Sequence, residues 1–166
     1  MSVAAIESQV RGAIESLGVP FEMMPCDPEF ADTALFCEHY AVPLDHSANT
    51  IIVASKKDPR QYAACIVLAD SRLDVNHAVS EAMGVRRLSF ATADETTSLT
   101  GMLVGGVTVF GLPPAMPILI DSRVMDQDYV VLGGGSRSWK VKMPPDGLRA
   151  LPAARVVENL AVRKTA

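Results

Sequence analysis

The sequence is 166 residues long, with 49% hydrophobic and 20% charged residues and a formal net charge of −4 at pH 7. These values are typical of a globular protein with a sizeable core, and they exclude a mostly disordered chain. No apolar run approaches the roughly 20 residues that span a bilayer, and the acidic balance argues against a general nucleic-acid binder, whose surface would be basic.

The amino terminus and the cysteines indicate a cellular compartment. The stretch MSVAAIESQVRG lacks a basic segment followed by a long apolar one, so no signal peptide is expected. The three cysteines, Cys26, Cys37 and Cys65, are an odd number without the spacing of a disulfide framework. We therefore expect a cytoplasmic protein without a membrane segment.

The first seventy residues are predicted to hold two helices and then a hairpin. Apolar residues at three- and four-residue steps predict a helix over residues 3–17 that ends at Gly18. After the strand candidate FEMM, Asp32 or Thr33 is expected to cap a second helix. The strand candidates NTIIVAS and YAACIVLAD follow, and the polar turn KKDPR between them suits a hairpin.

The rest of the chain is predicted to hold two helices followed mostly by strands. LDVNHAVSEAMG indicates a helix capped by Asp74, and Thr92 and Glu95 fit the capping box of another helix that ends near Gly101. Further strands are predicted over GGVTVF, PILIDS, DYVVLGG and SWKVKM, and a helical turn over DGLRAL. Strict βαβ alternation and linkers are absent, which predicts one α+β domain over residues 1–166 with a mixed sheet.

Two glycine clusters stand out in the strand-rich half, Gly105-Gly106 and Gly133-Gly134-Gly135. They match neither a P-loop nor a dinucleotide fingerprint. Tight turns between strands explain them most simply, but two clusters in the same half favour a shared cleft.

Other candidate groups have plain structural explanations. Cys37 and His39 lie two apart on a helix and face different ways, so neither a metal site nor a cofactor is expected. Phe30 is as consistent with core packing as with a pocket. The basic pairs, Lys56-Lys57 and Arg86-Arg87, suit a solvated surface, although either pair could contact a phosphate.

Five segments, read in order, resemble the YbaK-type aminoacyl-tRNA deacylases, which are related to the editing domain of bacterial prolyl-tRNA synthetases. The segments are DTALFCEHYAVP, SANTIIVA, LTGMLVGGVTVFG, PILIDSRVM and LGGGSRSWKVKMPPDGL. The resemblance implies an α+β fold whose mixed, mostly antiparallel sheet is surrounded by helices, with a pocket beside the central strands. It also implies hydrolysis of the ester that joins a wrongly attached amino acid to the 3′-terminal ribose of a tRNA, with help from the vicinal ribose hydroxyl.

The sequence departs from this family at the pocket. Asn49 stands where the family's deacylases usually carry a lysine before the buried strand, and Thr50 keeps the pattern. Val109 stands where the glycine loop usually has a proline, and Gly133 replaces a small polar residue. Gly105, Gly106, Gly135 and Arg137 match the family.

Two functions follow from the resemblance. In the first, the protein is a trans-editing deacylase that binds the acceptor end of a charged tRNA and neither DNA nor a membrane. Asn49, Gly105 and Gly106 are its catalytic candidates, and Phe30, Thr50, Gly135 and Arg137 its substrate-binding candidates. In the second, the protein is a non-catalytic module that binds an aminoacyl, nucleotide or small amide ligand.

The oligomeric state is left open between a monomer and a homodimer. The apolar stretch ARVVENLAV near the carboxyl terminus could pack on the domain's own sheet or on a second copy. Packing on its own sheet is the expected outcome.

Overall fold

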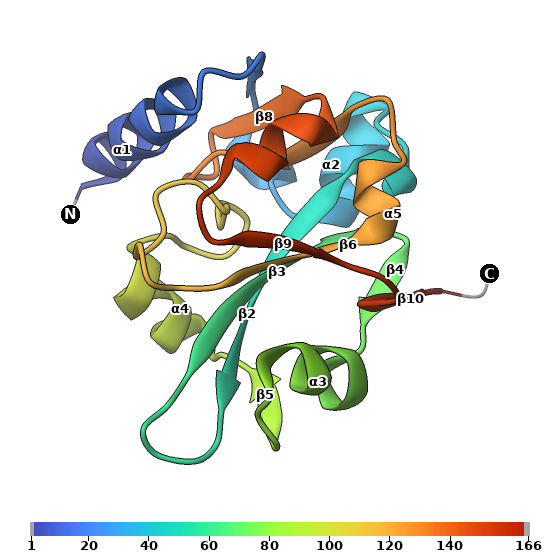
Figure 1. Ribbon diagram of the computed structural model, residues 1–166. Coiled ribbons are helices and arrows are strands. Elements are labelled where there is room, and N and C mark those ends of the chain that lie inside the picture. The colour runs from blue at the N-terminus through green and yellow to red at the C-terminus, as the bar shows by residue number, and fades with distance from the viewer. Residues whose placement is uncertain (1, 165–166) are drawn as a thin grey trace.

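The computed structural model describes residues 2–164, which form an α+β fold (Figure 1). The α-helices are α1 (Val3–Ser16), α2 (Thr33–Tyr40), α3 (Ser80–Met83), α4 (Ala93–Thr100) and α5 (Ser122–Met125). The shorter helical turns are η1 (Pro28–Phe30), η2 (Leu44–His46), η3 (Val75–Val79) and η4 (Pro145–Ala150). The strands are β1 (Glu22–Pro25), β2 (Ala48–Ser55), β3 (Tyr62–Leu68), β4 (Ser71–Leu73), β5 (Leu88–Phe90), β6 (Ile118–Asp121), β7 (Val130–Gly133), β8 (Trp139–Met143), β9 (Ala154–Val157) and β10 (Ala161–Arg163).

The strands form one mixed sheet and two smaller antiparallel ones. The five-stranded sheet has the order β5-β2-β3-β6-β9, in which β3, β6 and β9 run parallel and the other neighbours antiparallel. The three-stranded sheet has the order β1-β8-β7, and β10 pairs with β4. The predicted fold, α+β with a mixed and mostly antiparallel sheet, is confirmed.

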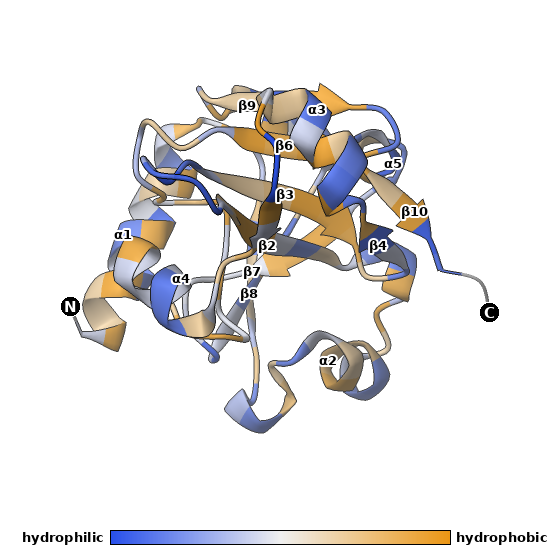
Figure 2. Ribbon diagram, turned by 90° about the horizontal axis from the view of Figure 1, so that it is seen from below, coloured by the Kyte–Doolittle hydropathy of each residue, from blue (hydrophilic) through white to orange (hydrophobic). Residues whose placement is uncertain are grey.

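Strands β2 and β3 form the centre of the five-stranded sheet. They pair along seven residues of β2, and the polar turn KKDPR joins them as the sequence predicts. Strand β2 is rich in β-branched residues, and Val53 of β2 and Ala64 and Ile66 of β3 are almost wholly buried. Figure 2 shows the apolar residues gathered along these strands, with helices against the sheet.

Local sequence signals place the helices as predicted. Helix α1 buries Ile6, Val10 and Ile14 in the same apolar cluster as β2, β3 and β6. Thr92 and Glu95 form the predicted capping box of α4. The stretch after Asp74 begins with the π-helical turn η3 before α3, and the Asp74 side chain caps it, as predicted, by accepting a hydrogen bond from the His77 N–H.

Residues 105–110 contradict the prediction of a strand over GGVTVF. They form a loop that begins with a tight turn at Gly105, whose φ is +89°. Val109 and Phe110 are buried in the core, so their apolar character reflects core packing rather than strand pairing. Short apolar runs do not distinguish these two cases.

The carboxyl-terminal stretch packs on the domain's own sheet. Strand β9 pairs in parallel with β6, from Ala154 opposite Ile118 to Val157 opposite Asp121. This confirms the expected outcome for ARVVENLAV. Within residues 2–164, no helix is long and apolar enough to cross a membrane.

Candidate functional site

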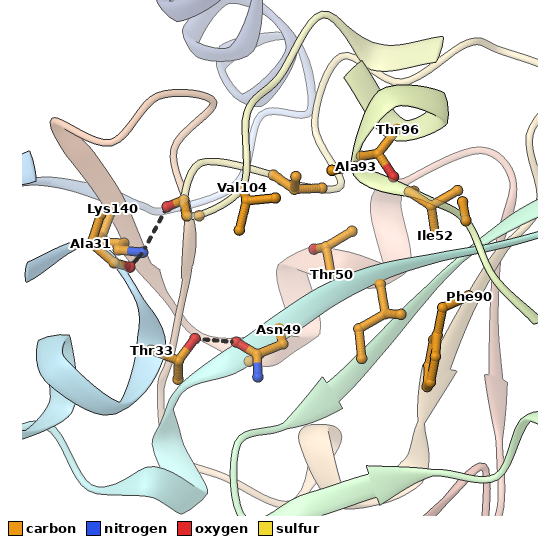
Figure 3. Close-up of a pocket in the computed structure, with 16 residues that line it drawn as sticks. Ala31, Thr33, Asn49, Thr50, Ile52, Phe90, Ala93, Thr96, Val104 and Lys140 are labelled. Atoms are coloured by element: carbon orange, nitrogen blue, oxygen red, sulfur yellow. Dashed lines mark hydrogen bonds between the residues drawn. The ribbon is translucent and has the colours of Figure 1, made fainter. Parts of the chain in front are cut away.

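A cavity of about 380 Å³ lies where the two larger sheets meet. Its walls come from β2, the first turn of α2, the segment before and within α4, the glycine turn near residue 105, and strands β7 and β8 (Figure 3). Its size falls within the usual range for small-ligand sites, about 300–1,000 Å³. The cavity contains several of the residues singled out from the sequence.

Thr50 presents unpartnered polar groups to this cavity. Its Oγ1 is buried and has no hydrogen-bond partner within residues 2–164. In a strand, the backbone groups of alternate residues face the same edge. The Ile52 carbonyl accepts a hydrogen bond from the Ala91 N–H, which shows that Ile52 faces the edge of β2 away from β3. The N–H and C=O of Thr50 face that edge too, and no described strand pairs with them there. Thr50 therefore brings to the cavity wall one buried hydroxyl without a partner and one stretch of unpaired strand edge.

Asn49 lines the same cavity, and a hydrogen bond orients its side chain. Its Oδ1 accepts a hydrogen bond of 2.7 Å from the Thr33 hydroxyl at the start of α2 (Figure 3). This leaves the Nδ2 group, with two N–H donors, without a protein acceptor in the described chain. Asn49 can thus donate to a ligand but brings no charge.

The two glycine clusters meet at the cavity, as their shared half suggested. The Gly135 N–H donates to the Gly106 carbonyl over 2.8 Å, and Gly105 and Gly133 line the cavity. A Cβ at Gly106 would lie 2.7–2.9 Å from the Ser136 backbone, so only glycine allows this approach. Gly106 and Gly135 therefore allow the two segments that form this wall of the cavity to pack closely.

The glycine turn leaves one amide free. The Gly106 N–H donates to the Leu103 carbonyl over 2.9 Å, which closes the turn, whereas the Gly105 N–H has no acceptor within residues 2–164. The positive φ of Gly105 is what the third position of a type II turn requires. Of the amides of Gly105 and Gly106, the two glycines among the catalytic candidates, only that of Gly105 is available to a ligand.

Arg137 holds this turn in place. Its guanidinium donates to the carbonyls of Pro28 and Val104 and to the Asp32 carboxylate, which uses all five of its N–H groups. The hydrogen bond from Arg137 lowers the pKa of Asp32. Because a trans peptide directs its C=O and N–H oppositely, the bond to the Val104 carbonyl points the Gly105 N–H away from Arg137.

Lys140 is the only ionisable residue among those lining the cavity. It lies on β8, opposite Gly133 of β7, and the residue is 7% exposed. The Nζ donates to the carbonyls of Ala31 (2.7 Å) and Gly105 (3.1 Å) and lies 5.2 Å from the Phe36 ring centroid. Burial lowers the pKa of Lys140.

Phe30, proposed as a pocket residue, lies outside the residues that line the cavity. Its ring stacks on His39 with 3.9 Å between centroids, and the two planes are nearly parallel. This contact belongs to the surface formed by η1 and α2; the Ala31 carbonyl follows η1 directly, and the Thr33 hydroxyl lies at the start of α2.

Sequence reasoning missed Thr33, Thr96 and Lys140. The sequence indicates Thr33 only as a helix cap, and Thr96 lies inside α4. Alternation along SWKVKM places Val141 and Met143 in the core and both lysines on the opposite face, which suggests solvent. In the structure that face is covered at Lys140. The one signal for this burial is that Lys140 pairs with Gly133 of the second glycine cluster, which lines the cavity.

With this geometry in place, comparison with known proteins identifies the family. The sequence model of the aminoacyl-tRNA editing domain family matches residues 27–151. The chain belongs to this family. The matched residues of the editing domain include β2, the glycine turn and Lys140, so the whole cavity wall lies inside the match.

Solved structures show the same fold as this editing domain. The hypothetical protein APE2540 is 25% identical over 90% of this chain and 98% of its own, with a TM-score of 0.80. A candidate trans-editing enzyme for prolyl-tRNA synthetase is 21% identical over 99% and 100%, with a TM-score of 0.81. A candidate signal-transduction protein from Marinobacter aquaeolei VT8 is 19% identical over 93% of this chain and 30% of its own, with a TM-score of 0.61.

Proposed function

We propose that this editing domain is a deacylase that hydrolyses the ester between an amino acid and the 3′-terminal ribose of a tRNA. One observation carries the proposal: the cavity combines unpartnered hydrogen-bonding groups with no carboxylate, histidine or cysteine among its lining residues. Such a site lacks a nucleophile paired with a base. It suits a substrate that is already activated, as an aminoacyl ester is, and that needs only positioning and charge stabilisation.

The groups present support the following reaction. Water adds to the ester carbonyl carbon, and the carbonyl oxygen becomes an oxyanion that accepts a hydrogen bond from the Gly105 N–H. The bond from that carbon to the ribose oxygen then breaks, and the proton lost by water ends on that oxygen through the vicinal hydroxyl. The products are a free amino acid and an uncharged tRNA end.

Thr50 binds the aminoacyl group and Asn49 the ribose in this scheme. The Thr50 carbonyl and hydroxyl accept from the α-ammonium group, and the Asn49 Nδ2 donates to a ribose oxygen. Their places on one strand, with side chains on either side of it, fix the amino acid across the open edge of β2. Among the sites predicted from the sequence, Asn49, Thr50 and Gly105 are thus proposed to touch the substrate, and Gly106, Gly135 and Arg137 to position the wall.

A second surface suits the phosphates of the tRNA. Four exposed basic residues gather beyond the far end of β2, where the Lys56 N–H donates to the Arg87 carbonyl over 3.0 Å. This basic cluster comprises Lys56, Lys57, Arg86 and Arg87. Six residues of strand place it about 20 Å from Thr50, within reach of the acceptor end. On a protein with net charge −4, such a local cluster is where a polyanion would bind.

The test is a deacylation survey with a panel of correctly and incorrectly charged tRNAs. We expect release of free amino acid from at least one misacylated tRNA and none from its correctly charged counterpart. Spontaneous hydrolysis in the absence of protein gives the baseline. A protein that leaves every ester in the panel at that baseline rate is not a deacylase.

The alternative, a non-catalytic binding module, is favoured by Asn49 in place of a cationic residue. It predicts saturable binding of an aminoacyl or nucleotide ligand without turnover. Calorimetric titration with the same charged tRNA ends, run beside the survey, separates the two functions.

A further inference from the structure

Lys140 is a buried cation without a counter-charge. It takes part in none of the ion pairs among residues 2–164. Two carbonyls and one aromatic face replace the water that it loses on burial. Burying a cation in this way is costly, and the half-exposed Lys142 on the same strand avoids most of the cost. An arrangement of this kind is typical of a functional site.

The contacts of the ammonium group leave one donor unused. An ammonium has three N–H groups, and the carbonyls of Ala31 and Gly105 take two of them. The Nζ reaches the cavity between α2 and the glycine turn, on the far side from Thr50 and Asn49 (Figure 3). Its bond to the Gly105 carbonyl ties it to the residue whose N–H is free.

We propose that Lys140 is the cation of this site and that its third N–H binds the oxygen that becomes negatively charged during ester hydrolysis. This proposal rests on the deacylase function above. Lys140 stays protonated throughout, and it stabilises the oxyanion together with the Gly105 N–H. It supplies from β8 the positive charge that Asn49 does not supply from β2.

The first test compares two lysines of one strand. Lys140→Met keeps an unbranched side chain, shorter by one atom, and removes the charge. Lys142→Met is the matched control, because the Lys142 ammonium lies over the Tyr129 ring, 4.5 Å from its centroid, and does not line the cavity. We expect kcat for aminoacyl-tRNA to fall about a hundredfold in Lys140→Met, the usual loss for one oxyanion donor, and to stay unchanged in Lys142→Met. Equal effects of the two substitutions would overturn the proposal.

The second test separates the chemical function of Lys140 from its structural one, since its bonds also tie two loops together. Asn49→Lys introduced into the Lys140→Met variant returns a cation to the cavity from β2, and we expect it to restore at least a tenth of the lost kcat. Thermal melting measures the loop contribution separately. A Lys140→Met variant that melts earlier and gains nothing from Asn49→Lys would show that Lys140 only ties the loops.

The pH profile gives a third readout. Because the pKa of Lys140 is lowered, kcat should decline on the alkaline side below the pH at which an ordinary lysine titrates, and this limb should vanish in Lys140→Met. The charged and titratable groups facing Lys140 are Cys26, Asp32, Cys37 and Arg137. Substituting Cys26 and Cys37 by serine should leave the limb in place, and its loss there would assign it to a thiol.

A binding measurement distinguishes failure of this proposal from failure of the deacylase function. The probe is an adenosine 3′-(1-aminoethyl)phosphonate, whose tetrahedral anionic phosphorus resembles the intermediate. If no charged tRNA is hydrolysed but the probe binds the natural protein at least tenfold more tightly than Lys140→Met, the deacylase function fails and the cationic site stands. Binding that is equal in both proteins, or absent from both, overturns the cationic site.

Discussion

Replacing Thr50 by valine is expected to move stability and activity in opposite directions. Valine keeps the branched shape and replaces the hydroxyl by a methyl group. The Oγ1 of Thr50 is buried without a partner, and such a group costs about 1–3 kcal/mol. Removing it should therefore raise the free energy of unfolding by about 1 kcal/mol, which corresponds to about 2–4 °C in Tm for a domain of this size.

The same substitution should slow deacylation. In the proposed complex the hydroxyl binds the substrate's α-ammonium group, and a hydrogen bond to a charged group contributes about 1.5–3 kcal/mol. Its loss predicts a fall in kcat/KM of about ten- to a hundredfold. Release of free amino acid from the misacylated tRNA, measured on the same protein samples as the melting curves, gives both numbers.

Thr108 offers a matched control for Thr50. Its Oγ1 is also buried without a partner among residues 2–164, and it does not line the cavity. Thr108→Val should gain similar stability and keep full activity. The reasoning is refuted if both variants keep full activity, because Thr50 would then be an ordinary buried hydroxyl, or if Thr50→Val destabilises the fold.

Three further predictions concern the surroundings of the cavity. Asp32→Asn should reduce the free energy of unfolding at neutral pH. The difference from the natural protein should shrink as the pH falls below about 3.8, because the lowered pKa of Asp32 gives a stabilising contribution that protonation removes. Urea unfolding at pH 7 and pH 3 measures this difference. Changing two residues of the basic cluster to glutamate should raise KM for aminoacyl-tRNA at least tenfold and flatten its salt dependence, with hydrolysis of aminoacyl-adenosine unchanged. Gly106→Ala should lower the free energy of unfolding by about 1–3 kcal/mol, since its Cβ would press on the Ser136 backbone, and denaturant titration tests this.

The elements that the sequence predicts well are those set by neighbours along the chain. The α4 capping box needs only Thr92 and Glu95, and the β2–β3 hairpin needs two apolar runs and a polar turn. The strand predicted over residues 105–110 is wrong for the opposite reason, because the apolar side chains there fill a core built by distant segments. Three-residue strands such as β4, β5 and β10 are too short to give a period of their own.

The same distinction separates the residues of the candidate site that the sequence reveals from those that it does not. Asn49 and Thr50 stand at a recognisable place, the polar step before a buried strand, and both line the cavity. Lys140 could not be placed, because alternation gives only the face on which a side chain lies. What covers that face is decided by α2 and the glycine turn, each more than 30 residues away in sequence.

The open edge of β2 explains why the site lies at the junction of the sheets. An unpaired strand edge normally invites pairing with another chain. On the edge of β2 away from β3, β7 approaches at Ser47 and β5 pairs from Val53 onward, so the unpaired stretch is centred on Thr50. A stretch this short, recessed in a cavity of about 380 Å³, excludes a second strand but admits an amino acid. The fold can therefore keep backbone donors and acceptors available for a ligand without exposing an edge that aggregates.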